Sequence, residues 1–246
     1  MANPSDPQLP PQPDDDHDAS NPFESPAASE LPSVTEFSGV RYVSRRAKPV
    51  NVLTSIWIRP RVTVRRVLDR DPGRHVLLIT VLSGISNALG NSVQSLGKAP
   101  DLGILLAASL YVAAIGAVVS ILLLYVGSWL FTGVGRMFGG VGHTNELRTA
   151  IAYANIISMW CLPLTLCAVV VFWHALRDPQ NQTLYNVLVA IGVVLIICGV
   201  WQFVVLCGTV AEAHQFSVVS AFLTTLLIYS VVFGLVFLIF WSTGIV

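Results

Sequence analysis

Residues 102–135 read LGILLAASLYVAAIGAVVSILLLYVGSWLFTGVG and contain no Asp, Glu, Lys or Arg. A helix needs about 20 consecutive apolar residues to cross the hydrocarbon core of a bilayer, and this stretch is long enough to supply them. Over the whole chain, 54% of the residues are hydrophobic and 11% are charged, with a mean hydropathy of +0.68. Because soluble domains carry about 25% charged residues, this composition excludes a single soluble globular domain.

Four further stretches lack the same four residue types. They are residues 75–97, 149–176, 179–211 and 213–246. Each is long enough for one membrane-spanning helix. The sequence therefore predicts an all-α, polytopic membrane helix bundle with about five transmembrane helices, over residues 76–96, 108–130, 151–172, 185–207 and 218–241.

The first predicted span is the least apolar of the five. Its second half reads GNSVQSLG, and only residues 76–89 are predominantly apolar. A backbone that enters a membrane without crossing it must be shielded by protein. A re-entrant hairpin is therefore the alternative to a spanning helix at this position.

Charge divides the chain before the first span. Residues 1–40 hold eight acidic residues and no Lys or Arg, whereas residues 41–74 hold ten basic and two acidic residues. We interpret residues 1–50 as a disordered tail, first acidic and then basic, because its composition cannot bury enough surface to offset ordering. With the N-terminus inside, the cytoplasmic segments hold twelve basic residues and the outer loops two, Lys98 and Arg177. This bias predicts a cytoplasmic N-terminus and, after five spans, an external C-terminus.

Residues 51–71 predict a short amphipathic helix that precedes the five-helix domain of residues 72–246. Pro60 suits a first helical position, and Val64, Val67 and Leu68 share a face. Such a helix fits the headgroup layer and attracts anionic lipid headgroups; the alternative is a solvated basic flank without specific binding. The candidate membrane-surface residues are Trp57, Arg61, Arg65 and Arg66.

The sequence offers little catalytic chemistry. It lacks HExxH, GxSxG and Walker A motifs, and its four cysteines lie in apolar stretches without zinc-like spacing. We therefore predict no enzymatic activity, no catalytic or metal-binding residue, no cofactor and no nucleic-acid partner. Glu212 and His214 lie between the last two spans, where a helix-end pair in the headgroup layer is the simplest explanation.

Three amides in the first span share one helical face. Asn87, Asn91 and Gln94 are spaced i, i+4 and i+7. Polar groups in a bilayer must find partners, so we expect either interhelical hydrogen bonds or a polar path. Pairs of small residues also recur at helical spacing and favour close helix packing, within the bundle or between copies. They are Gly84/Ala88, Ala113/Ala117, Gly116/Ser120 and Gly192/Gly199.

Two motifs together resemble the YIP family of Ypt/Rab-interacting membrane proteins, most closely its bacterial branch. The first is WIRPRVTVRR at residues 57–66, which contains Pro60 and Thr63. The second is FGGVGHT at residues 138–144, followed by Tyr153 and Pro163. The remaining motif positions are Gly139, Gly140 and Gly142. Where eukaryotic members carry Asp-Leu-x-Gly-Pro, this chain has Asp71-Pro72-Gly73, so Rab binding is not carried over.

The resemblance implies a polar cytosolic N-terminus, five spans, and neither enzymatic activity nor a cofactor. We expect a membrane adaptor or organiser in the bacterial inner membrane that recruits partners at its cytoplasmic face. Besides the lipid bilayer, its expected partners are further copies of the chain or other membrane proteins. The alternative is a small transporter or channel subunit with a polar path lined by Asn87, Asn91 and Gln94.

Overall fold

The computed structural model describes residues 51–71 and 73–242. The tail predicted over residues 1–50 lies outside these ranges. Over the described residues the secondary structure is helical, without strands. The helices are α2 (Val52–Ser55), α3 (Pro60–Arg70), α4 (Val76–Asn91), α5 (Val93–Gly97), α6 (Leu102–Met137), α7 (Thr144–Ala154), α8 (Ile156–Arg177), α9 (Gln182–His214) and α10 (Val218–Ser242).

The predicted spans are present as four long apolar helices and one shorter one. The long ones are Leu102–Met137, Thr144–Arg177, Gln182–His214 and Val218–Ile239, and the shorter one is Val76–Asn91. α6 and α9 extend beyond the predicted bounds because side chains cap them: Asp101 accepts from the N–H of Ile104 at 2.8 Å, and Asn181 accepts from that of Leu184. The all-α membrane bundle is confirmed.

The weakest predicted span is two helices. At 1.5 Å per residue, α4 is about 24 Å long, shorter than the roughly 30 Å hydrocarbon core. Ser92 interrupts the helix, and α5 continues it. The carbonyl of Ala99 then accepts hydrogen bonds from Trp173 and Arg177 at the end of α8. The segment thus continues to the end of the bundle where α8 finishes, rather than turning back as a re-entrant hairpin would.

Small residues bring α4 and α6 into close contact. A Cβ added to Gly84 would lie 2.7 Å from the carbonyl oxygen of Gly116, and one added to Gly116 would lie 2.4 Å from the Cβ of Ala88. Two of the predicted small-residue pairs therefore meet each other within the bundle. By contrast, nothing lies within 4 Å of a Cβ placed at Gly192 or Gly199 on α9.

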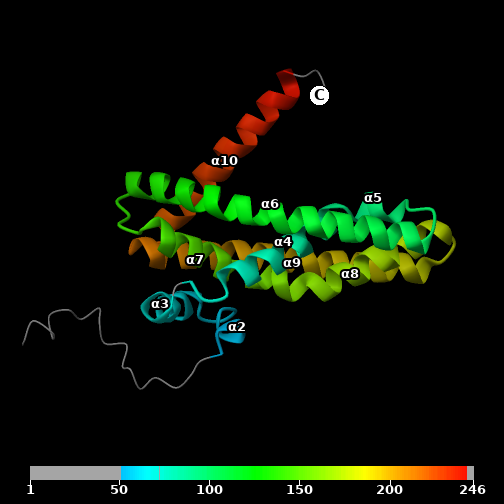
Figure 1. Ribbon diagram of the computed structural model, residues 1–246, viewed down its shortest axis with the longest axis horizontal. Helices are drawn as coiled ribbons and strands as arrows, with labels where there is room; N and C mark the ends of the chain where they lie inside the picture. Colours follow the sequence, from blue (N-terminus) through cyan, green and yellow to red (C-terminus); the bar gives the residue numbers. More distant parts are fainter. Residues whose placement is uncertain (1–50, 72, 243–246) are drawn as a thin grey trace, which may run out of the picture. The chain divides into compact units, whose positions relative to one another are not determined.

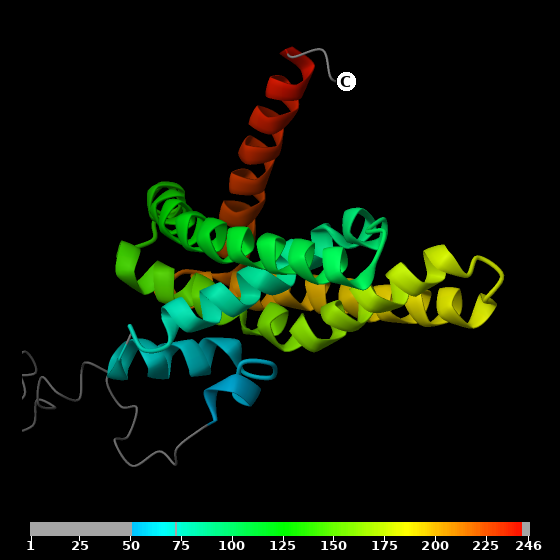
Figure 2. The ribbon, with the colours of Figure 1, turned by 45° about the vertical axis from the view of Figure 1, so that its right-hand side comes forward.

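The long helices run alongside one another, and α10 departs from them. α4, α6, α8 and α9 form the bundle in Figure 1. The first half of α10 packs against it through Ala221, Thr224 and Ile228, which are buried. Beyond Tyr229 every described side chain is at least partly exposed, and Figure 2 shows this half of α10 leaving the bundle. α8 continues through Pro163.

The largest group of buried apolar side chains lies where α3, α7 and α9 meet. Ile56, Val64, Leu147 and Val210 are fully buried there. A second, smaller group joins α4, α5, α6 and α8 and includes Leu89 and Leu105. We call the end of the bundle formed by α3, residues 138–143 and the end of α9 the basic end. The main core fixes the elements of that end.

Candidate functional site

Helix α3 is docked on protein at the basic end. Pro60 is its first residue and lies against Gly208 of α9, where an added Cβ would be 3.5 Å from the proline ring. One turn further along α9, the carboxylate of Glu212 accepts a hydrogen bond from Arg61 Nε at 3.1 Å. The buried face of α3 consists of Thr63, Val64 and Val67.

This docking changes what the amphipathic pattern means. We expected the apolar face of residues 51–71 to meet lipid, but Val64 and Val67 belong to the core that α7 and α9 share. Trp57, expected as a headgroup anchor, is half-buried against the same core. The neighbouring Ile58 is instead 81% exposed. An amphipathic sequence pattern indicates that one face of a helix is buried. The pattern does not show whether that face is buried against lipid or against other parts of the protein.

The three predicted surface arginines have different surroundings. Arg61 pairs with Glu212, and Arg65 Nε lies 3.4 Å from Asp69 Oδ1 one turn away. Arg66 Nε is buried and lacks a hydrogen-bond partner among the described residues. Thr63 is a structural residue. Its hydroxyl donates to the carbonyl oxygen of Arg59 at 2.8 Å, and its Oγ1 lies 2.8 Å from Ser55 Oγ.

The glycines of the predicted family motif surround a buried histidine. His214, the last residue of α9, is fully buried. A Cβ on Gly140 would lie 2.4 Å from His214 Nδ1, and a Cβ on Gly142 would lie 2.5 Å from the carbonyl oxygen of Ala213. Gly135, near the end of α6, leaves still less room: its Cβ would be 2.1 Å from His214 Nε2. Only glycine lets these three backbone positions approach the ring so closely.

We call Gly135, Gly140 and Gly142, with the His214 ring that they enclose, the glycine cradle. Hydrogen bonds fix the imidazole within it. Nδ1 of His214 accepts from the N–H of Gly142 at 3.3 Å, and Nε2 lies 3.0 Å from the carbonyl oxygen of Phe131. These partners specify a neutral ring with the proton on Nε2. The carbonyl of His214 also accepts from the N–H of Val141 at 3.1 Å. Gly139 adopts φ +82°, a left-handed turn that glycine allows at little cost.

Glu212 and His214 lie in the last turn of α9, the helix end where we expected them, but their side chains have different partners. Glu212 bonds Arg61 of α3, whereas His214 is enclosed by glycines of α6 and of residues 138–143. The two side chains thus attach two different segments to the end of α9. The glycine motif and the histidine are both visible in the sequence, but nothing in their spacing shows that they meet.

Tyr153 attaches α7 to the turn that precedes α4. It is buried, and its hydroxyl donates to the carbonyl oxygen of Arg74 at 2.9 Å. In the same turn Arg74 Nε donates to His75 Nε2 at 3.0 Å. His75 has φ 58°, a left-handed conformation that costs a residue with a Cβ about 1–2 kcal/mol.

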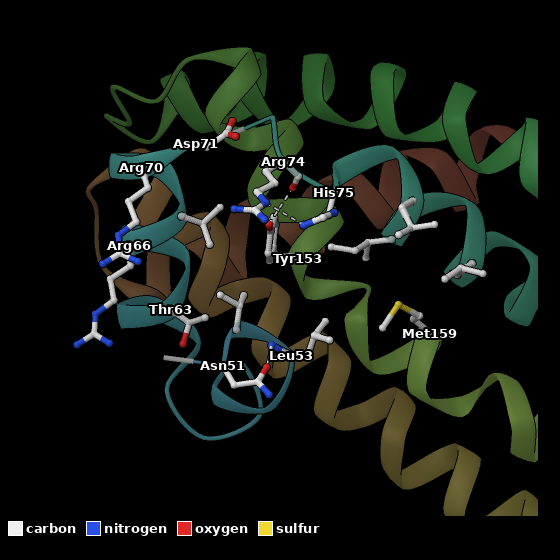
Figure 3. A pocket seen from close by; sticks show the side chains of 15 residues that line it. Asn51, Leu53, Thr63, Arg66, Arg70, Asp71, Arg74, His75, Tyr153 and Met159 are labelled. Carbon is white, nitrogen blue, oxygen red and sulfur yellow. Dashed lines mark hydrogen bonds between the residues drawn. The ribbon is translucent and has the colours of Figure 1, made fainter. Parts of the chain in front are cut away.

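A cavity of about 640 Å³ opens between α2–α3 and the start of α4. We call it the α3–α4 cavity. Figure 3 shows Arg66 and Arg70 on the α3 side, Met159 of α8 on the opposite side, and Arg74, His75 and Tyr153 between them. Its volume lies within the range of about 300–1,000 Å³ that is common for small-molecule sites. One side of the cavity is basic and the other apolar.

A second polar group lies within the bundle. Ser158 Oγ is 3.2 Å from Asn87 Oδ1 and 2.5 Å from Gln202 Oε1. Gln202 Nε2 donates to Asn155 Oδ1 at 2.7 Å. We call Asn87, Asn155, Ser158 and Gln202 the polar cluster. These contacts run as a chain from Asn87 of α4 through Ser158 of α8 to Gln202 of α9 and on to Asn155. The Ser158 hydroxyl has one hydrogen, so it donates to one of the two amide oxygens at a time.

Only one of the three predicted amides belongs to the polar cluster. Asn87, Asn91 and Gln94 are all exposed, and of the three Asn87 joins the cluster by its bond to Ser158. Gln94 lies beyond the interruption at Ser92, where α4 gives way to α5. Sequence reasoning missed Asn155, Ser158 and Gln202.

Within residues 51–71 and 73–242, no group of three or more His, Cys, Asp or Glu side chains is placed to hold a metal ion. The groups that form the cavity and the glycine cradle are arginines, backbone groups and apolar side chains.

Comparison with known proteins gives one match. The sequence pattern of the Yip1 domain matches residues 54–240. This range begins in α2 and ends in α10, so it includes both motifs, the glycine cradle, the α3–α4 cavity and the polar cluster. Neither a curated protein nor a solved structure matches the chain.

Proposed function

The chain belongs to the Yip1 family, and from that premise we propose that it is a non-enzymatic adaptor or organiser that recruits partners at the basic end. It is an integral membrane protein, as its long apolar helices show. The proposal adds that the basic end faces the cytoplasm, in the bacterial inner membrane, and that the C-terminus lies outside. The distribution of charge supports the orientation, and the packing at the basic end supports the recruiting role.

The distribution of basic residues supports this orientation. Arg61 and Arg65 belong to α3 at the basic end, and Arg136 is in the last turn of α6, directly before residues 138–143, whereas Lys98 and Arg177 lie where α5 and α8 finish. Short segments rich in Lys and Arg remain in the cytoplasm during insertion. In this orientation the arginines of α3 face the anionic leaflet, where each is worth about 1 kcal/mol of attraction.

The observation that carries the proposal is the way three separate segments are fixed into one surface. Arg61–Glu212 attaches α3 to α9, and His214 attaches residues 138–143 to the same helix end. Beside these attachments Met137 and Val141 are 79% and 63% exposed. Exposed apolar groups on a fixed support are typical of protein-binding surfaces. The arrangement suits recognition of other membrane proteins, including further copies of this chain.

Site-specific photo-crosslinking in cells tests the recruiting surface. A photoreactive amino acid at position 141 should give discrete protein adducts. The same amino acid at position 110, which is also on the surface (Leu110 is 73% exposed), should give lipid adducts only. Adducts at position 141 should disappear when Gly135→Ala disturbs the cradle. The proposal fails if positions 110 and 141 give the same protein adducts, or if position 141 gives none.

The polar cluster supports transport as the second candidate function. Asn87, Ser158 and Gln202 are polar groups at membrane depth, where such residues often mark pathways. We favour the adaptor because Ser158, Gln202 and Asn155 bond one another across helices and because Asn91 lies on the outer surface of the bundle. In a variant without native cysteines, Asn91→Cys should react slowly with a membrane-impermeant thiol reagent, since thiolate forms only where water reaches. Rapid reaction would favour transport.

A further inference from the structure

The α3–α4 cavity has a basic side that residues 51–71 and 73–242 leave largely unpaired. Arg66, Arg70 and Arg74 line it together with one carboxylate, Asp71. Among the described residues, the ion pairs of α3 involve Arg61 and Arg65, which do not line the cavity. Arg66 Nε is buried without a hydrogen-bond partner in the same ranges. A buried donor without a partner is costly, so an anionic group at this side would be stabilised.

The turn at the cavity places its basic groups in a strained conformation. His75 has a left-handed backbone, and its Nε2 accepts from Arg74 Nε. Within the described part of the chain the other N–H groups of that guanidinium have no hydrogen-bond partner, so they can donate to an anion. Tyr153 holds the carbonyl of Arg74 from below. Strained residues persist where the surrounding structure fixes them, and ligand clamps are a common setting.

The opposite side of the cavity is apolar. Leu78 and Leu82 lie one helical turn apart on α4, and Met159 of α8 completes this side. Leu78 is 56% exposed. From His75 to Leu82 the helix rises about 10 Å, away from the charged turn and along the membrane-spanning part of α4. An apolar side that runs in this direction suits the part of an acyl chain nearest the headgroup.

We propose that the α3–α4 cavity binds one anionic phospholipid, with its phosphate at Arg70 and Arg74 and one acyl chain along Leu78, Leu82 and Met159. The orientation of this lipid in the cytoplasmic leaflet rests on the proposed function. A soluble phosphate would use only the basic side, and a neutral lipid only the apolar side. An anionic phospholipid uses both, and it is the abundant amphiphile at this depth. The site is distinct from general attraction of α3 to a charged surface, because it involves a defined cavity.

Native mass spectrometry of the full chain in detergent tests the site. The protein is titrated with dioleoylphosphatidylglycerol and, separately, with dioleoylphosphatidylcholine. The wild type should retain one phosphatidylglycerol in preference to phosphatidylcholine. Arg70→Gln with Arg74→Gln should weaken that binding at least about tenfold, since two charges near a phosphate are lost. The matched control, Arg59→Gln with Arg65→Gln, removes the same charge from exposed or partly exposed positions that do not line the cavity, keeps the Arg61–Glu212 pair, and should change binding less than about threefold.

Two further arms separate a lipid from a free phosphate. Leu82→Trp fills the apolar side and should weaken phosphatidylglycerol binding by a similar factor, with an unchanged size-exclusion profile. Millimolar inorganic phosphate should leave the bound lipid in place. Displacement by phosphate would replace the lipid site by an anion site, and equal weakening by the two double variants would reduce it to surface charge.

The lipid inference and the adaptor proposal fail separately. The detergent titration involves no membrane sidedness and no partner protein, so a negative result overturns the lipid site and leaves the recruiting surface untouched. A negative crosslinking result at position 141 does the reverse.

Discussion

Replacing Gly135 with alanine should destabilise the basic end, because the new methyl group would clash with the buried His214 side chain. The added Cβ would lie 2.1 Å from His214 Nε2, well inside van der Waals contact. The ring is fully buried and bonded to Phe131 and Gly142. Overpacking costs roughly 1–3 kcal/mol, and two disturbed hydrogen bonds add about 1 kcal/mol each. Alanine's better helix propensity returns up to about 1 kcal/mol, so the net loss of stability is about 2–4 kcal/mol.

The assay is thermal unfolding in detergent, followed by the fraction that remains monodisperse after heating. A loss of this size corresponds to a midpoint lower by roughly 5–10 °C for a chain of this length. Gly133→Ala is the matched control on the same helix, because nothing lies within 4 Å of its added Cβ, and it should leave the midpoint unchanged or slightly raised.

A double-variant cycle isolates the imidazole as the cause. In a His214→Ala background Gly135→Ala should behave like Gly133→Ala, since the group that it meets is gone, which gives a coupling energy of about 2 kcal/mol or more. The reasoning is refuted if Gly135→Ala costs the same with and without the imidazole, or if it is silent in the wild type.

Three other substitutions test the packing that supports this end. Gly116→Ala should lower the unfolding midpoint, because its Cβ would lie 2.4 Å from that of Ala88, whereas Gly192→Ala, with nothing within 4 Å, should not; equal midpoints would contradict the close contact of α4 and α6. Tyr153→Phe removes the 2.9 Å hydrogen bond to the turn before α4 and should cost about 1 kcal/mol by the same assay; an unchanged midpoint would show that the bond contributes nothing. Gln202→Leu removes the bond that Asn155 Oδ1 accepts and one of the two contacts of Ser158 and should cost about 1–2 kcal/mol; a stabilised variant would contradict a stabilising role for the polar cluster.

The spans could be predicted from the sequence because a bilayer constrains both length and composition. A charge-free stretch of more than about 20 residues has few other uses, and α6 and α9 occupy two such stretches. The contact of Gly84 with Gly116 was also within reach, since small residues at helical spacing mark close helix packing. The sequence could not tell which small residues remain free, as Gly192 does.

The glycine cradle and the polar cluster depend on tertiary contacts, which the local sequence pattern does not show. His214 meets Gly135 and Gly142 across 79 and 72 positions of sequence. Similarly, the hydrogen-bond partner of Asn87 is Ser158 of α8 rather than a neighbour in its own stripe. A helical period assigns residues to a face, whereas the partner of that face is set by how the helices pack. For the same reason the apolar side of α3 was assigned to lipid although it faces α7 and α9.

The most direct test of the central claim is the side of the membrane on which the basic end lies. In a variant without native cysteines, Val141→Cys places one thiol on the exposed segment beside the cradle. A membrane-impermeant maleimide is applied to right-side-out and to inside-out vesicles of the cytoplasmic membrane. The account predicts labelling in inside-out vesicles only. Labelling in right-side-out vesicles would place the proposed recruiting surface outside the cell and contradict the adaptor proposal.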